Sequence, residues 1–147
     1  MTIAVDMDIT ESEWEVMRVV WANQQVTSKE IIQVLAKKKD WKPATTKTFI
    51  GRLVKKQMLN TKKDGNRYLY STDVNEIAFV KSMLAELFEN VCDREKGKII
   101  AHLLSNITVS FDDISEIDKV LDVKRKEAVD QVPCNCIPGQ CHCNVAN

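Results

Sequence analysis

Four of the five cysteines lie in one ten-residue stretch, C-N-C-I-P-G-Q-C-H-C, with the spacing Cys-x-Cys-x4-Cys-x-Cys. Four thiolates form a donor set that suits soft or borderline ions, above all Cu(I) and Zn(II). Zinc would take all four in a closed tetrahedral site, whereas close Cys-x-Cys pairs suit thiolates that bridge several Cu(I) ions. The sequence therefore predicts a metal site. Its expected ligands are Cys134, Cys136, Cys141 and Cys143.

Two further residues could extend this metal site, but both are expected to stand outside it. His142 lies between two of the cysteines, which favours a bystander over a ligand. Cys92 falls between two predicted helices, far from the others, which favours a free, partly buried structural cysteine. The opening residues 1–10 lack the basic and apolar segments of a secretory signal. The cysteines are therefore expected in a reducing compartment, where clustered thiols indicate metal binding rather than disulfides.

The composition bounds the fold that must position these cysteines. The 147 residues are 44% hydrophobic and include only four Gly and three Pro, which favours helices over an all-β fold. The length suits one domain or two small ones. No run of 18 apolar residues occurs, so no membrane-spanning segment is expected.

The net charge of zero conceals a basic block. Residues 37–67 contain eleven Lys or Arg and two Asp, a net charge of +9, so the remaining residues together carry −9. A basic block inside an acidic chain is the electrostatic pattern expected for a polyanionic partner. A solvated charged surface without a partner is the alternative.

Three helices followed by a hairpin are predicted between residues 8 and 71. Thr10 and Thr27 are expected to cap helices over 10–21 and 27–38, each with a glutamate three residues later that completes a capping box. A third helix begins near Pro43, and the pair Asp64–Gly65 then indicates a two-residue hairpin turn. This order of elements makes a winged helix-turn-helix. The residues expected to face inward from the first two helices are Trp14, Met17, Val20, Trp21, Ile31, Val34 and Leu35.

The third helix is predicted to have two unlike faces. At about 100° per residue, Thr46, Phe49, Ile50, Leu53 and Gln57 cluster on one side, and the other side is small, hydroxylated and cationic. In a helix-turn-helix this helix enters the major groove by its N-terminal part, while cations further along contact phosphates. Helix geometry and charge together therefore predict DNA binding. The expected contact residues are Ala44, Thr45, Lys47, Thr48, Arg52, Lys55, Lys56, Lys62, Lys63 and Arg67.

The C-terminal part is predicted to be helical again, over 73–91, 95–107 and 112–123. Three short amphipathic helices make a poor core alone, so a second copy of the chain is expected to cover their apolar stripes. Packing against the chain's own winged helix is the alternative. The densest stripe, expected to hold a homodimer together, is Ile99, Ile100, Leu103, Leu104 and Ile107.

The predicted fold is thus mainly α, with three parts. Residues 1–71 form a winged helix-turn-helix DNA-binding domain with a small β-hairpin wing. Residues 72–126 form a helical dimerisation region. Residues 127–147 form a flexible Cys-rich metal-binding tail.

The stretch W-K-P-A-T-T-K-T-F-I-G-R-L-V-K-K at 41–56 resembles the third helix of the penicillinase repressors, the BlaI/MecI family, and I-T-E-S-E-W-E-V-M-R-V-V-W resembles their first helix. The resemblance extends over roughly residues 8–125. It implies a dimeric bacterial, cytoplasmic winged-helix repressor on palindromic operators of the TACA-nn-TGTA type. Thr45, Thr48 and Arg52 match positions of the family pattern, and Lys47 fills a variable one.

The tail departs from the penicillinase repressors and instead resembles the copper-responsive, CopY-type branch, whose signature is Cys-x-Cys-x4-Cys-x-Cys. That resemblance implies repression of copper-transport genes. It also implies that Zn(II) holds the repressing form and that Cu(I) releases the repressor from DNA. A copper chaperone that delivers Cu(I) is a further expected partner.

Three other functions are considered, and specific residues favour or disfavour each of them. A zinc- or cadmium-responsive repressor would have the same fold. A Cu(I) buffer or metallochaperone would have no use for the basic helix and wing. An enzyme is not expected, because no Cys-x-x-Cys or nucleotide loop occurs and neither His102 nor His142 has an evident triad partner.

Overall fold

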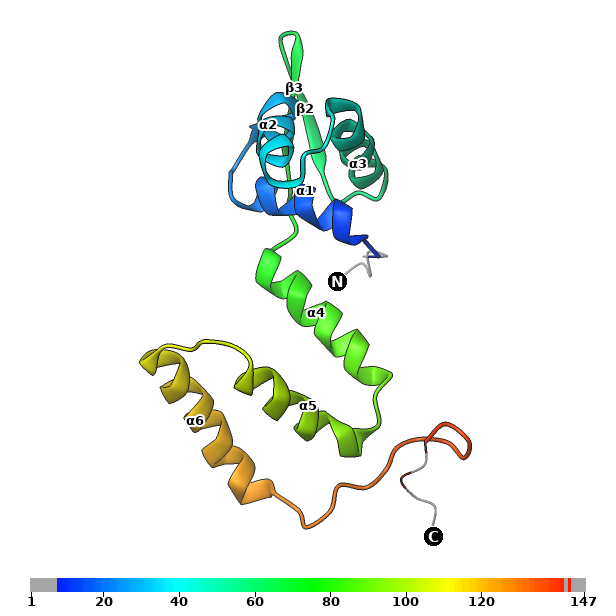
Figure 1. Ribbon diagram of the computed structural model, residues 1–147, viewed down its shortest axis with the longest axis vertical. Coiled ribbons are helices and arrows are strands. Elements are labelled where there is room, and N and C mark those ends of the chain that lie inside the picture. The colour runs from blue at the N-terminus through cyan, green and yellow to red at the C-terminus, as the bar shows by residue number, and fades with distance from the viewer. Residues whose placement is uncertain (1–7, 142, 144–147) are drawn as a thin grey trace. The chain divides into compact units, whose positions relative to one another are not determined.

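The computed structural model describes residues 8–141 and 143, and two compact units, Met1–Lys81 and Ser82–Asn147, are taken separately (Figure 1). None of the described helices is both long and apolar enough to cross a membrane. The first unit contains α1 (Glu11–Trp21), β1 (Val26–Thr27), α2 (Ser28–Lys39), α3 (Pro43–Lys55), β2 (Asn60–Asp64) and β3 (Arg67–Ser71). The later helices are α4 (Glu76–Glu89), which begins in the first unit, α5 (Asp93–Ser105) and α6 (Phe111–Glu127).

The first two helices begin at the predicted threonines, but only one forms the full capping box. The Thr10 hydroxyl accepts the Glu13 N–H at 3.1 Å, and the Glu13 carboxylate accepts the Thr10 N–H at 3.0 Å. The Thr27 hydroxyl likewise accepts the Glu30 N–H at 3.2 Å. The Glu30 carboxylate, however, accepts the Thr27 hydroxyl at 3.1 Å, so the predicted bond to the Thr27 backbone is wrong.

A three-stranded antiparallel sheet with the order β1-β3-β2 completes the winged helix. The strand β1 is not predicted from the sequence; it consists of two residues that pair with Leu69 and Tyr70 of β3. In the hairpin Asp64 pairs with Arg67, so Gly65 and Asn66 form the turn, one residue later than expected. Gly65 has φ +64°, a conformation that glycine adopts without steric cost.

The core of the first unit lies where α1, α2 and α3 meet, and most inward-facing residues are as predicted. Val34 is an exception: its side chain is 47% exposed, and the buried residues of α2 are Ile31 and Leu35 alone. Gln57 is also exposed, since α3 ends at Lys55 and Gln57 has φ +64°. The fully buried residues of largest volume are Phe79, Met17, Ile31, Leu35, Leu53 and Met58.

The start of α4 is fastened onto α1 by aromatic contacts. The ring of Phe79, which is buried, lies 5.1 Å from that of Trp14 and 5.7 Å from that of Trp21, centroid to centroid. The Trp21 indole N–H donates to the Val74 carbonyl at 2.8 Å. Trp14 and Trp21 are therefore half-buried contacts to α4 rather than members of the central core.

The second unit leaves its apolar residues open. Within the described residues, neither α5 nor α6 contains a buried side chain. Leu103 is 49% exposed, Ile107 59% and Phe111 90%. Apolar stripes of this kind mark surfaces that a partner covers, because contiguous exposed apolar area is unfavourable in water.

Candidate nucleic-acid interface and sulfur cluster

The helix α3 has the two faces that the sequence predicts. Thr46, Ile50 and Leu53 are buried, and the opposite side is exposed along the whole helix. Proline at the first helical position begins the helix without a side-chain cap. The exposed side is called the cationic face below. It consists of Ala44, Lys47, Thr48, Gly51, Arg52 and Lys55.

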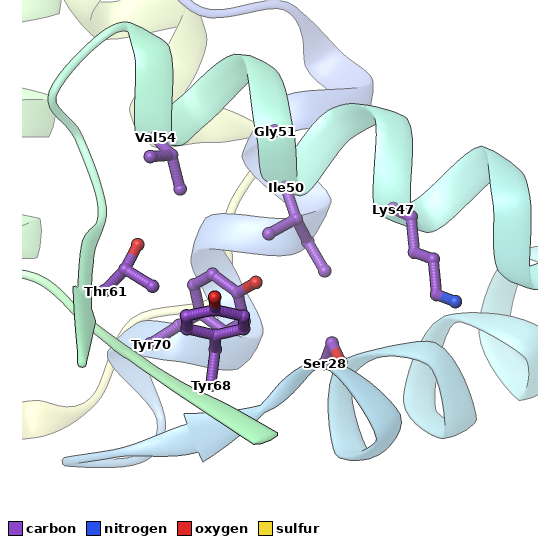
Figure 2. A pocket seen from close by; sticks show the side chains of 8 residues that line it. All are labelled: Ser28, Lys47, Ile50, Gly51, Val54, Thr61, Tyr68 and Tyr70. Atoms are coloured by element: carbon purple, nitrogen blue, oxygen red, sulfur yellow. The ribbon is translucent and has the colours of Figure 1, made fainter. Parts of the chain in front are cut away.

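A groove of about 440 Å³ lies between the cationic face and the hairpin (Figure 2). The rings of Tyr68 and Tyr70 come from β3, and the ammonium of Lys47 extends from α3 at one end. A Cβ added to Gly51 would meet no atom within 4 Å, so packing in this fold does not require a glycine there. The full lining is Ser28, Lys47, Ile50, Gly51, Val54, Thr61, Tyr68 and Tyr70.

Some residues expected to contact DNA already have partners within the domain. The Thr48 hydroxyl donates to the Ala44 carbonyl at 3.0 Å. The Arg52 guanidinium lies 5.5 Å from the centroid of the Phe49 ring, and Arg67 pairs with Asp64 at 3.3 Å. All are exposed arrangements that cost little to rearrange. Among the cations expected to contact DNA, four make no ion pair, side-chain hydrogen bond or aromatic contact within the described residues, namely Lys47, Lys55, Lys62 and Lys63.

Lys56 differs from these cations because its charge is used inside the domain. Its ammonium lies 2.8 Å from the Glu13 carboxylate, which is 1% exposed, and it donates to the Asp8 carbonyl at 2.8 Å. Burial tends to raise the pKa of Glu13, but hydrogen bonds from Lys56 and from the Thr10 N–H outweigh it and hold this pKa below its ordinary value. Lys56 is expected from the sequence to contact DNA, whereas in the structure its ammonium pairs with Glu13 inside the domain.

We expect Lys56→Met to lower the free energy of unfolding by about 1–3 kcal/mol, because it leaves the buried Glu13 carboxylate without its cation. Lys55→Met, the matched control on the exposed side, is expected to cost less than about 0.5 kcal/mol. Urea denaturation measures both.

The stabilisation by the Lys56–Glu13 pair should depend on pH. The pKa of Glu13 is lowered in the folded state, so the pair stabilises the fold at pH values above the ordinary pKa of 4.5, and this contribution is lost as the pH falls below it. The difference between wild type and Lys56→Met should therefore shrink in acid. Equal losses for the two variants would contradict the structural role of Lys56.

The tail cysteines lie close together, and Cys92 joins them. The Sγ atoms of Cys134 and Cys141 are 3.3 Å apart, and those of Cys141 and Cys143 are 3.2 Å apart. The backbone N–H of Cys136 donates to the Cys134 sulfur at 3.4 Å. The sulfurs of Cys92, Cys134, Cys136 and Cys141 all lie within 4.8 Å of one another. The five cysteines together are called the sulfur cluster below, namely Cys92, Cys134, Cys136, Cys141 and Cys143.

The sulfur cluster fits a thiophilic metal ion. All five cysteines are free thiols, and the closest sulfurs are 3.2 Å apart, far beyond a disulfide bond of about 2.05 Å. A zinc ion with Zn–S near 2.3 Å would separate its sulfurs by roughly 3.8 Å. Loss of solvent and hydrogen bonds with the neighbouring thiols of Cys141, Cys92 and Cys134 raise the pKa of Cys136. Crowded thiols resist ionisation in this way unless a cation is present.

The position of Cys92 is the main feature that sequence reasoning missed. The expectation of a free, partly buried thiol agrees with the structure, but the contact of Cys92 with Cys134, 42 positions later in the chain, was not predicted. A fifth cysteine between two predicted helices was the available signal. His142, expected to be a bystander, lies outside the described residues.

Comparisons with known proteins agree with this architecture. The penicillinase repressor family matches residues 9–123. An uncharacterized 16.5 kDa protein in the ptsI 3' region of Latilactobacillus sakei is 43% identical over 136 residues, which cover 92% of this chain and 93% of that protein. The penicillinase repressor of Bacillus licheniformis is 27% identical over 114 residues, 78% of this chain and 89% of that protein.

Among solved structures, the Bacillus licheniformis BlaI monomer in complex with the blaP half-operator shares 36% identity over 47% of this chain and 84% of that one, with a TM-score of 0.43. The family match spans the winged helix and most of the following helices. This chain therefore belongs to the penicillinase repressor (BlaI/MecI) family of DNA-binding transcriptional repressors, and it has a winged-helix fold.

Proposed function

We propose that this repressor is copper-responsive and of the CopY type. A homodimer binds a palindromic operator of copper-transport genes while Zn(II) occupies the tail, and Cu(I) displaces zinc and releases the DNA. The observation that carries this proposal is the sulfur cluster, which lies in a chain whose remainder belongs to a repressor family. An all-sulfur donor set is the kind that selects thiophilic ions.

Operator binding is assigned to the cationic face and the wing. The N-terminal part of α3 presents Thr45, Lys47 and Thr48 to base edges in the major groove, on an operator of the TACA-nn-TGTA type. Arg52 and Lys55 lie further along the helix and suit phosphates. The unpaired lysines of the hairpin, at positions 62 and 63, suit the adjacent backbone. Because each phosphate contact releases a counterion from the DNA, operator binding should weaken as the salt concentration rises.

We expect Thr48→Ala and Arg52→Ala each to weaken specific operator binding by roughly 1–3 kcal/mol, about 5- to 150-fold. Arg125→Ala removes the same type of side chain from α6 and should leave the affinity unchanged. A gel shift at fixed salt, with a scrambled duplex beside the operator, makes the measurement. Unchanged operator affinity for both α3 variants would refute the assignment of this face.

The homodimer is assigned to the apolar residues of α5 and α6. Their exposure in the single chain supports a second copy as the partner. Two-fold symmetry of the protein then requires a palindromic site. Ile100 and Leu103 lie three residues apart on α5 and are both exposed, so they can enter the same interface.

The metal switch is assigned to exchange at the tail. One Zn(II) or two Cu(I) on four thiolates gives the same site charge of −2, so the signal must come from geometry rather than from charge. Zinc, when bound, supplies a closed tetrahedral centre that holds the tail in one compact form. A copper chaperone is the expected donor of Cu(I). Because soft thiolates also bind zinc and cadmium, a repressor that responds to those ions is the second candidate.

The chemistry of the first unit argues against a Cu(I) buffer or metallochaperone. Such a carrier needs only the tail, whereas this chain also holds unpaired lysines beside a groove on α3. Specific binding to a palindromic duplex separates a repressor from a carrier.

A further inference from the structure

We propose that Cys92 is itself a metal ligand and fixes the tail's ion to the first turn of α5. This inference rests on the proposed function in one respect, namely that the sulfur cluster binds a thiophilic ion such as Zn(II) or Cu(I). The Cys92 sulfur lies 3.7 Å from that of Cys134 and 3.5 Å from that of Cys143. It is also one of four sulfurs that lie within 4.8 Å of one another, so one ion can reach it together with tail sulfurs.

Contacts that involve no sulfur also hold the tail at this helix end. The Asp93 N–H donates to the side-chain oxygen of Asn135 at 2.9 Å. The Arg94 guanidinium donates to the Val132 carbonyl at 3.1 Å and to the Cys143 carbonyl at 2.6 Å. These hydrogen bonds hold both ends of the tail's cysteine stretch close to Cys92.

The local backbone leaves the Cys92 thiol free for a ligand. Cys92 is the N-cap residue of α5, a helix of 13 residues, with φ −56° and ψ 133°, and its side chain makes no capping hydrogen bond. The thiol therefore gives up no capping hydrogen bond when it binds an ion. A thiolate is the form that binds metal.

A ligand at position 92 gives the metal direct contact with the dimerisation region. The same helix that begins at the sulfur cluster carries the exposed Ile100 and Leu103. A change of coordination would then act on α5 itself, and not only through the segment that joins α6 to the tail.

NMR of the full-length protein loaded with an NMR-active cadmium isotope tests this inference directly. Scalar coupling between bound cadmium and cysteine β protons identifies each ligand, and we expect a cross-peak to the β protons of Cys92. Cross-peaks confined to the tail cysteines would overturn the role of Cys92 and leave the metal-sensing proposal intact. Absence of any bound cadmium would overturn both.

A variant series gives an independent readout. Cys92→Ser should lower the affinity for cadmium and zinc at least about tenfold, since even outer-shell partners of a metal contribute that much. Cys92→His should recover part of the zinc affinity, because imidazole is also a zinc ligand. Val91→Ala alters the same turn without removing a sulfur and should bind as wild type does. Wild-type affinity in a folded Cys92→Ser protein, checked by circular dichroism, would contradict the inference.

Discussion

Leu103→Asp is expected to dissociate the proposed homodimer and to weaken operator binding by roughly 10²- to 10⁴-fold. The expected loss is large because the two DNA-binding domains of a dimer are connected. Once one domain is bound, the other binds its half-site as an intramolecular event, and a monomer lacks this increase in affinity. Leu103 is 49% exposed in the single chain, so in a dimer its side chain would be covered by the partner. An unpaired carboxylate in an apolar interface is costly.

Sedimentation at micromolar concentration measures the first effect, and titration of the operator measures the second. Lys98→Asp places the same charge on a solvent-exposed position of the same helix and should leave the dimer intact. A monomeric wild-type protein at micromolar concentration would contradict the dimer. So would a Leu103→Asp variant that sediments as wild type does.

Replacement of Cys134, Cys136, Cys141 and Cys143 by serine should abolish both metal binding and copper-induced release of DNA. Hydroxyl groups are hard, weak ligands for Cu(I), and Cys92 alone cannot form a site. The winged helix should remain folded, because no tail cysteine belongs to its core. The operator binding that the zinc-free winged helix retains should therefore be insensitive to copper.

The control for the four-serine variant changes the same tail without removing sulfur. Ile137 and Gln140 are exposed and lie between the cysteine pairs, so Ile137→Ser with Gln140→Ser tests the effect of serine alone. Metal content by mass spectrometry and fluorescence anisotropy on operator DNA provide the measurements. A four-serine protein that still leaves the operator when Cu(I) is added would show that the switch lies elsewhere.

The winged helix was largely predictable because its signals are local. Thr10 and Glu13 lie three residues apart, and the two faces of α3 follow from residue spacing alone. Val34 was misplaced because spacing shows which residues share a face but not how much of that face is covered. The strand β1 is too short for a periodicity signal, and its pairing with β3 is non-local.

The candidate sites were predictable to different degrees for the same reason. The tail cysteines are close in sequence, so their clustering could be inferred. The contacts of Cys92 with Cys134 and of Lys56 with Glu13 join residues more than 40 positions apart. Such contacts depend on tertiary packing, which no pattern within one segment encodes. Both change the interpretation: Lys56 becomes a structural residue, and Cys92 links the tail to α5.

Anaerobic titration of the zinc-loaded protein with Cu(I), on operator DNA, tests the central claim most directly. Zinc release is followed with a colorimetric chelator while fluorescence anisotropy follows the DNA complex. A coupling of about 1–3 kcal/mol would weaken operator binding roughly 5- to 150-fold. We predict that zinc release and DNA release occur together at the same Cu(I) equivalents. Dissociation of DNA while zinc stays bound, or loss of zinc while the complex stays intact, would contradict the exchange mechanism.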